Sequence, residues 1–373
     1  MKKVLLTATV QSHIAQFHLP LIEMLKKNGY TVHIAAKDNL SEKNGLKIIG
    51  ADKIFDIPFE RSPIRINNIK AYNKIKKLIK ENHYDVIHCN TPMGGIITRL
   101  AAKNTRKNGT KVIYTAHGFH FYKGSPVKNW IIYYPIEKFM CRYTDVLITI
   151  TEEDYKLATN NFKVEVKRIN GVGVNTKKYF QLPRTYIDKK KEDLNLKSNK
   201  ILLCIGELNK NKNQIIILKS LVKVKKEFPN VKLLIAGNGP LLTDLKDHVK
   251  QYRIEKEVEF LGYRTDLNEF INVSDIIISA SLREGLPLNI MESMVCGKPV
   301  IASNNRGHRE LIKDSVNGYI VEVNNDSEIA EKVKILFNNR ELYRNLSENC
   351  INISERYIEK SIMIEMKRIY EEI

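Results

Sequence analysis

Short apolar runs rich in β-branched residues alternate with longer amphipathic stretches along the whole chain. In the first half this pattern predicts strands at residues 3–7, 31–35, 86–89, 112–115, 146–149 and 167–170. In the second half it predicts strands at 201–205, 232–236, 259–261, 276–279, 300–302 and 319–322. Strands that alternate with helices form parallel sheets covered by helices on both faces. Because this order occurs twice, the pattern predicts an α/β protein with two doubly wound domains.

A polar and charged stretch, QLPRTYIDKKKEDLNLKSNK, separates the two halves, and an apolar strand pattern follows it at once. Stretches of this kind are typical of domain boundaries. We therefore predict an N-terminal domain at 1–182, a linker at 183–199 and a second domain at 200–353. Residues 354–373 have the pattern of an amphipathic helix, and we expect this helix to cross back and cover the first domain.

The net charge of +19 is concentrated in the first domain. Residues 1–180 contain 30 basic and 14 acidic side chains, whereas the remainder contains 31 and 28. A basic half indicates an anionic partner, which could be nucleic acid, an anionic membrane surface or a phosphorylated substrate. The most basic helical pattern, at 61–80, fits either a contact with anionic lipid or an ordinary solvated helix face.

The five cysteines are scattered, odd in number and never spaced as C-x-x-C. This usage indicates reduced thiols, a cytoplasmic location and no zinc site. No stretch approaches the 18 or so apolar residues of a membrane span. The N-terminal apolar run turns polar at Gln11, so we interpret it as a buried strand and not as a signal peptide.

The stretch EGLPLNIMESMVCGKPVIAS carries the candidate chemistry. Glu284 lies in a loop after a predicted strand, and Pro287 suits the first turn of a helix that carries Glu292. The free N–H groups of Leu288 and Asn289 at the helix start would bind an anion such as phosphate. Carboxylates on either side of a phosphate match a nucleotide-sugar, with Glu284 on the sugar and Glu292 on the ribose. The alternative is a solvated glutamate near a helix cap.

This stretch resembles the retaining glycosyltransferases of family 4, which have the GT-B fold. The residues that match are Glu284, Gly285, Glu292, Met294, Gly297, Pro299, Val300, Ile301 and Ala302. A later segment, RGHRELIKDSVNGYIV, matches through Gly307, Glu310, Gly318 and Val321. The resemblance implies two Rossmann-like domains that face a cleft. It also implies transfer of a sugar from a nucleotide-sugar with retention at the anomeric carbon. In this family the donor is usually a UDP-sugar.

The resemblance implies further site residues. Gly206 and Lys212 would bind the donor diphosphate, although Glu207 replaces the arginine that the family carries beside this glycine. Arg264 would lie near the nucleobase. His117, which ends the segment VIYTAH, is similar to the family histidine that contacts the donor sugar, so His117 and Glu284 are the candidate catalytic residues.

No D-x-D motif occurs in the chain, which favours a donor site without a metal and without any other cofactor. The whole chain is similar to glycosyltransferases of bacterial capsule and exopolysaccharide synthesis. It would then extend a saccharide on a lipid carrier, as a cytoplasmic protein that docks peripherally on the inner face of the cell membrane.

Three other functions stay open. A GT-B epimerase or phosphorylase would share the fold. A basic nucleic-acid-binding protein would account for the charge, but basic motifs interleaved with aromatic residues are missing. A nicotinamide oxidoreductase needs a complete G-x-G-x-x-G motif, and Leu242 stands at the third glycine of IAGNGPLL.

Overall fold

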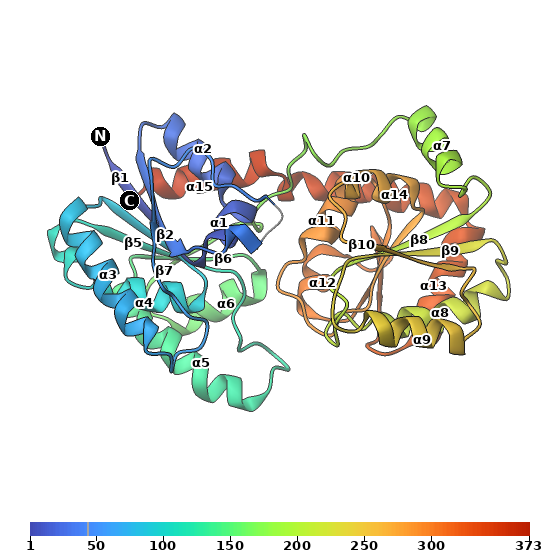
Figure 1. Cartoon of the computed structure of the whole chain (residues 1–373), viewed down its shortest axis with the longest axis horizontal. Coiled ribbons are helices and arrows are strands. Elements are labelled where there is room, and N and C mark those ends of the chain that lie inside the picture. Colours follow the sequence, from blue (N-terminus) through green and yellow to red (C-terminus); the bar gives the residue numbers. More distant parts are fainter. Residues whose placement is uncertain (43–44) are drawn as a thin grey trace. The chain divides into compact units, whose positions relative to one another are not determined.

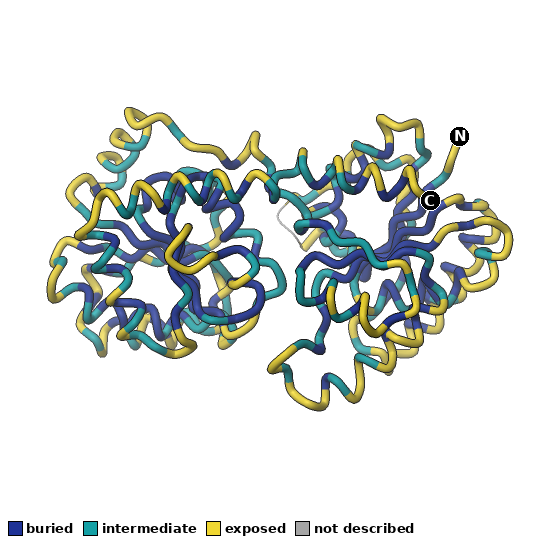
Figure 2. Tube along the Cα trace, turned by 180° about the vertical axis from the view of Figure 1, so that it is seen from behind, coloured by how far each residue is buried: buried dark blue, intermediate teal, exposed yellow. Residues whose placement is uncertain are grey.

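The computed structural model describes residues 1–42 and 45–373, which form two compact units (Figure 1). The first unit comprises Met1–Gly173 together with Glu359–Ile373, and the second comprises Val174–Ile358. Figure 2 shows that the strands form the buried layer of each unit, beneath helices that expose their outer sides.

The first unit contains a seven-stranded parallel sheet in the order β3-β2-β1-β4-β5-β6-β7. Its strands are β1 (Lys3–Val10), β2 (Thr31–Lys37), β3 (Lys53–Asp56), β4 (Val86–Asn90), β5 (Lys111–Ala116), β6 (Val146–Thr149) and β7 (Glu165–Arg168). Its helices are α1 (Gln11–Phe17), α2 (Leu19–Lys27), α3 (Asn67–Asn82), α4 (Pro92–Ala102), α5 (Val127–Met140), α6 (Glu152–Asn161) and α15 (Glu359–Glu371). Short 3₁₀ turns are η1 (Leu40–Glu42), η2 (Thr105–Asn108) and η3 (Cys141–Tyr143).

Apolar residues fill the space between this sheet and its helices. Leu5 and Ile87 belong to one buried cluster with Ile75 of α3. The C-terminal helix α15 contacts α2. Helix α15 also contacts the sheet, because the hydroxyl of its Tyr370 lies 2.8 Å from Nδ1 of His88 on β4. The last helix of the chain is therefore part of the first unit, as Figure 1 shows.

The second unit contains a six-stranded parallel sheet in the order β10-β9-β8-β11-β12-β13. Its strands are β8 (Lys200–Ile205), β9 (Val231–Ala236), β10 (Val258–Gly262), β11 (Ile276–Ser279), β12 (Val300–Ser303) and β13 (Gly318–Val321). Its helices are α7 (Arg184–Asp193), α8 (Gln214–Lys225), α9 (Leu242–Gln251), α10 (Leu267–Val273), α11 (Leu288–Val295), α12 (Arg306–Leu311), α13 (Asp326–Asn338), α14 (Arg340–Ser354) and the 3₁₀ turn η4 (Glu355–Tyr357).

Alternation along β8 explains why its sequence is apolar from Ile201 to Ile205. Leu202 and Cys204 belong to the buried cluster on one face of the sheet. Ile201 and Leu203 belong to the cluster on the other face. A parallel strand covered on both sides has no position at which a polar side chain would meet water.

The two predicted doubly wound domains are confirmed, and each of the twelve predicted strands overlaps a strand of the structure. The additional strand β3 lies at the sheet edge and is largely exposed, so its short segment KIFD lacks the apolar run that marked the others. The stretch 183–199, predicted as a linker, contains α7 and belongs to the second unit. The compact units meet in sequence at Gly173 and Val174, nine residues before the predicted boundary at 182.

Burial of a charged pair fixes α5 against α4. Arg99 Nη2 on α4 lies 3.0 Å from Glu137 Oε2 on α5, and the arginine side chain is fully buried. The Tyr114 hydroxyl also donates to Glu137 at 3.3 Å.

We expect Glu137→Ala to lower the free energy of unfolding by about 3–5 kcal/mol, because it leaves the Arg99 charge buried and unpaired. Chemical denaturation would measure this change. The matched control is Glu81→Ala, which removes an exposed i,i+4 pair with Lys77 and should cost no more than about 0.5 kcal/mol. Similar losses in the two variants would contradict the assignment.

Candidate donor site

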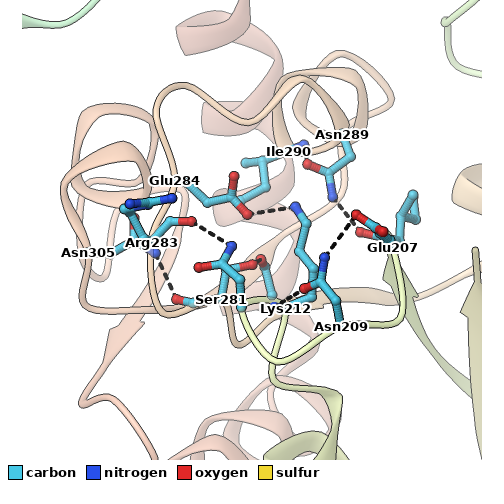
Figure 3. Close-up of polar contacts among 12 residues, drawn as sticks. Glu207, Asn209, Lys212, Ser281, Arg283, Glu284, Asn289, Ile290 and Asn305 are labelled. Atoms are coloured by element: carbon cyan, nitrogen blue, oxygen red, sulfur yellow. Dashed lines mark hydrogen bonds and ion pairs between the residues drawn. The ribbon is translucent and has the colours of Figure 1, made fainter. Parts of the chain in front are cut away.

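Two loops at the carboxyl edge of the second sheet are joined by hydrogen bonds. One follows β8 and the other follows β11, which is its neighbour in the sheet. The backbone N–H of Leu282 donates to the Asn211 carbonyl at 2.8 Å. The Asn211 side chain donates to the Arg283 carbonyl at 3.0 Å (Figure 3). The loop that contains Lys212 and the loop that contains Glu284 therefore hold each other in place.

An ion pair lies between these loops. Lys212 Nζ is 2.6 Å from Glu284 Oε1, and the two side chains are 22% and 14% exposed (Figure 3). Gly206 lets the lysine stem pass, because a Cβ at this position would lie 3.1 Å from Lys212 Cε. The structure thus brings together three of the predicted site residues and leaves the cation reachable by a ligand.

The start of α11 lies beside the end of β8. The Asn289 side chain donates to the Ile205 carbonyl at 2.7 Å (Figure 3). Pro287 occupies the N-cap position, one residue before the predicted first turn, and its own side chain makes no cap hydrogen bond. Leu288 and Asn289 then stand in the first turn, where backbone N–H groups and the helix dipole favour an anion.

Glu292 lies further along α11 and is buried, with 8% of its surface exposed. Burial raises the pKa of this carboxyl to about 7, and a hydrogen bond from Tyr179 offsets part of that rise. A carboxyl with this pKa gains charge near neutral pH and can then accept hydrogen bonds from two hydroxyls of a ligand.

Two other predicted contacts have partners of their own. Arg264 makes a two-pronged ion pair with Asp266, which fixes the loop after β10 and raises the pKa of the guanidinium. Glu207 is exposed, and its carboxylate accepts a hydrogen bond from the Asn209 side chain at 2.9 Å (Figure 3).

A buried histidine network that the sequence did not indicate supports the loop of Glu284. His308 Nδ1 donates to the Ser303 carbonyl at 2.7 Å, and its Nε2 lies 3.1 Å from the Ser279 hydroxyl. Burial lowers the pKa of His308 to about 4, so the ring is neutral. Beside it, a Cβ on Gly307 would lie 2.4 Å from the Gly285 carbonyl oxygen, so this close approach requires glycine.

A second polar group lies at the carboxyl edge of the first sheet. His117 follows β5, and its Nε2 is 3.1 Å from Asn90 Oδ1 at the end of β4. His13 and His18 come from the segment after β1, and their rings lie 4.8 and 5.5 Å from that of His117. Burial lowers the pKa of all three rings, for His13 to about 4. Within residues 1–42 and 45–373, the Nε2 atoms of His13 and His18 have no hydrogen-bond partner.

The three histidines could also hold a metal. One ring nitrogen from each lies within 4.8 Å of the other two, and neutral imidazoles are common ligands of zinc-type ions. This group belongs to the first unit, whereas Lys212 and α11 belong to the second. The prediction that the donor diphosphate needs no metal therefore stays a prediction. Sequence reasoning named His117 but missed the other two, whose only signal was their position after the first strand.

Comparison with known proteins places the chain in a family. Residues 3–151 match the family described as "Glycosyl transferase 4-like", and residues 187–352 match "Glycosyl transferases group 1". A protein of Bacillus subtilis (strain 168) that carries the name glycosyltransferase EpsD is 37% identical over 372 residues, or 99% of this chain and 96% of the relative. The chain therefore belongs to the group 1, family 4-like glycosyltransferases, and it is an enzyme of the transferase class with the GT-B fold.

Two further relatives extend this comparison. The UDP-Gal:alpha-D-GlcNAc-diphosphoundecaprenol alpha-1,3-galactosyltransferase of Escherichia coli is 29% identical over 77% of this chain and 75% of its own length. The crystal structure of Anabaena HepE in complex with UDP matches with a TM-score of 0.81 over the whole of both chains, at 19% identity, and so supports the fold. Across the described part of the chain, no helix has the length and apolar character needed to span a bilayer.

We expect the affinity for a nucleotide-sugar to rise between about pH 6 and pH 8, because Glu292 must lose its proton before it can accept from both ribose hydroxyls. Glu292→Gln should weaken binding at pH 8 by about 1.5–3 kcal/mol and remove this rise. Calorimetry with an intact nucleotide-sugar avoids the titration of a terminal phosphate near pH 6. A wild-type affinity that is constant over this range would contradict the role.

Without ligand, the stability of the folded protein should fall as the pH rises, whereas the affinity for the ligand should increase. The folded-state pKa of Glu292 is raised from 4.5 to about 7, so its contribution to stability is full below pH 4.5 and is lost as the pH rises through 7. The difference in melting temperature between wild type and Glu292→Gln should therefore change across this range. A difference that is constant with pH would show that Glu292 titrates normally.

Lys212→Ala should weaken binding of a nucleoside diphosphate and leave binding of the nucleoside alone unchanged, because the ammonium group would act on the diphosphate only. Titration calorimetry with both ligands measures this. The control is Lys210→Ala, which changes an exposed lysine of the same loop. Equal loss for both ligands would indicate a structural role for Lys212.

Proposed function

We propose that this protein transfers a sugar from a UDP-sugar to a saccharide acceptor carried on a lipid diphosphate, with retention at the anomeric carbon. The pathway would be the synthesis of a capsular, exopolymeric or other cell-surface polysaccharide. The observation that carries this proposal is the Lys212–Glu284 ion pair, which lies in the loops beside the start of α11, the helix in which Glu292 is buried.

The proposed donor site uses each charge for one part of the ligand. Lys212 and the start of α11, with Leu288 and Asn289, bind the diphosphate, and Gly206 leaves room for it. Glu292 accepts from the ribose hydroxyls, and Glu284 accepts from hydroxyls of the sugar. The ion pair supports this division, because Lys212 already orients the Glu284 carboxylate at 2.6 Å.

Two assignments rest on the family resemblance. Arg264 would lie near the nucleobase, and the ion pair with Asp266 suits it to shape that loop more than to contact the base directly. His117 would contact the donor sugar, and its lowered pKa suits a neutral ring that donates or accepts a hydrogen bond.

The transfer step needs no carboxylate base. The bond between the anomeric carbon and the diphosphate oxygen breaks, and the acceptor hydroxyl oxygen bonds to the anomeric carbon on the same face. The hydroxyl proton passes to the leaving phosphate oxygen. Lys212 and the α11 start stabilise the negative charge that develops on that oxygen, which is the work that a metal does in other transferases.

The acceptor is proposed from relatives and from charge. The name of the Escherichia coli relative specifies a diphosphoundecaprenol acceptor. In this chain, α3 exposes five lysines of the basic stretch 61–80, which suits contact with an anionic membrane. These lysines are Lys70, Lys74, Lys76, Lys77 and Lys80.

The test is transfer from a panel of nucleotide-sugars to a lipid-diphosphate-linked saccharide in excess EDTA. We expect UDP-sugars to react, the product to keep the anomeric configuration of the donor by NMR, and the rate to survive the chelator. Inversion, or loss of activity that magnesium or manganese restores, would overturn the proposed mechanism. Release of a sugar phosphate, or an altered nucleotide-sugar without acceptor, would indicate the phosphorylase or the epimerase instead.

A further inference from the structure

In helix α5 of the first unit, apolar side chains face the solvent and polar side chains are buried. Six of its large apolar residues are exposed, whereas two of its polar residues, Asn129 and Glu137, are buried together with Met140. Val127 and Ile131 are 73% and 70% exposed, although the apolar side chains of a surface helix normally face the core. The other exposed apolar side chains of the helix are Ile132, Tyr133, Ile136 and Phe139. We call this set of six residues the α5 apolar face.

Buried polar contacts hold the helix in this orientation. Glu137 pairs with the fully buried Arg99, and the Asn129 side chain donates to the His120 carbonyl at 2.8 Å. A rotation of α5 that buried the isoleucines would break both contacts and leave a charge unpaired inside the protein. The exposure of the α5 apolar face is therefore built into the fold.

Cations lie among and beside the residues of this face, and the segment 123–142 has no exposed acid. The exposed basic side chains of this segment are Lys123, Lys128, Lys138 and Arg142. Their only acidic neighbour within the segment is the buried Glu137. Lysines are depleted at protein–protein interfaces, whereas an apolar helix face bordered by Lys, Arg and Tyr is typical of helices that lie in the interface of an anionic bilayer.

We propose that α5 is an in-plane membrane anchor whose apolar face enters the headgroup region of an anionic bilayer, with the surrounding cations on lipid phosphates. The proposal rests on the proposed function in that the bilayer would hold the lipid-linked acceptor. Helix α4 contacts both α5 and the basic helix α3, and Figure 1 shows the three helices following one another in the first unit. The lysines of α3 can then add an electrostatic attraction to the same membrane.

Trp130 provides a built-in reporter. It is the single tryptophan of the chain, it lies on α5, and it is only partly buried against Phe121 and Tyr134. Insertion of α5 should shift its emission to shorter wavelength, and lipids brominated on their acyl chains should quench it. Quenching by these lipids shows that the tryptophan has entered the acyl-chain region. Adsorption through surface lysines alone would not produce quenching.

The experiment uses the full chain with vesicles of phosphatidylglycerol and phosphatidylcholine, or of phosphatidylcholine alone, at low and high salt. We expect binding to the anionic vesicles with quenching of Trp130, and only partial release by salt. Ile131→Ser with Ile136→Ser should weaken vesicle binding at least tenfold, because each CH₂ withdrawn from a bilayer costs about fourfold in partitioning. The matched control is Ile364→Ser, which changes an exposed isoleucine of α15.

A variant with Lys74, Lys76, Lys77 and Lys80 of α3 changed to glutamine separates the two contributions. It should lose part of the salt dependence and keep the quenching. Wild-type binding by the α5 variant, or no quenching of Trp130 in wild type, would overturn the anchor. So would the absence of vesicle binding together with a concentration-dependent dimer that the α5 variant abolishes.

Failure of the anchor can be told apart from failure of the proposed function. Transfer to a short, water-soluble acceptor needs no membrane, so the α5 variant should keep wild-type activity in that assay. If the soluble assay succeeds and vesicle binding fails, only the anchor is wrong. If vesicle binding succeeds and no nucleotide-sugar reacts, the proposed function is wrong and the anchor stands.

Discussion

Parallel pairing of the strands is the constraint on which both candidate sites depend. In a parallel sheet every loop that follows a strand emerges at the same edge, so residues far apart in sequence meet there. The pairing of β8 with β11 brings Lys212 within 2.6 Å of Glu284, although 72 residues separate them. In the first unit, β1, β4 and β5 are neighbours, and their ends bring His13, Asn90 and His117 together.

The carboxyl edge of the second sheet combines Lys212 with two carboxylates in different environments. Glu284 is paired with Lys212, whereas Glu292 is buried in α11 and has its pKa raised to about 7. Ionising a buried carboxyl is costly, and Tyr179 supplies only one hydrogen bond, so Glu292 gains from a ligand whose hydroxyls replace the lost water. A buried carboxyl whose pKa is raised in this way is typical of a binding site.

The first unit places its polar and apolar groups in an unusual way. Arg99 and Glu137 are buried together, and as a consequence α5 exposes its isoleucines. The neutral histidines after β1, His13 and His18, each leave Nε2 without a hydrogen-bond partner among the described residues. Neither arrangement maximises stability, because buried unpaired polar atoms and exposed apolar side chains both cost free energy. Both are understandable if the unit has to meet other molecules at these two places.

The sequence by itself determined the fold class, the two parallel sheets and the family, because β-branched runs buried on both faces and the Glu284–Ala302 motif are local signals. It also named Lys212 and Glu284, but not their contact. It missed β3, whose edge position demands no apolar run, and it assigned α7 to a linker because polar composition fits either. Only the tertiary structure decided the histidine cluster, the support of the donor loop by His308, and the orientation of α5. These depend on which strand ends are neighbours and on which polar side chain finds a buried partner, and neither is encoded in the spacing of residues along the chain.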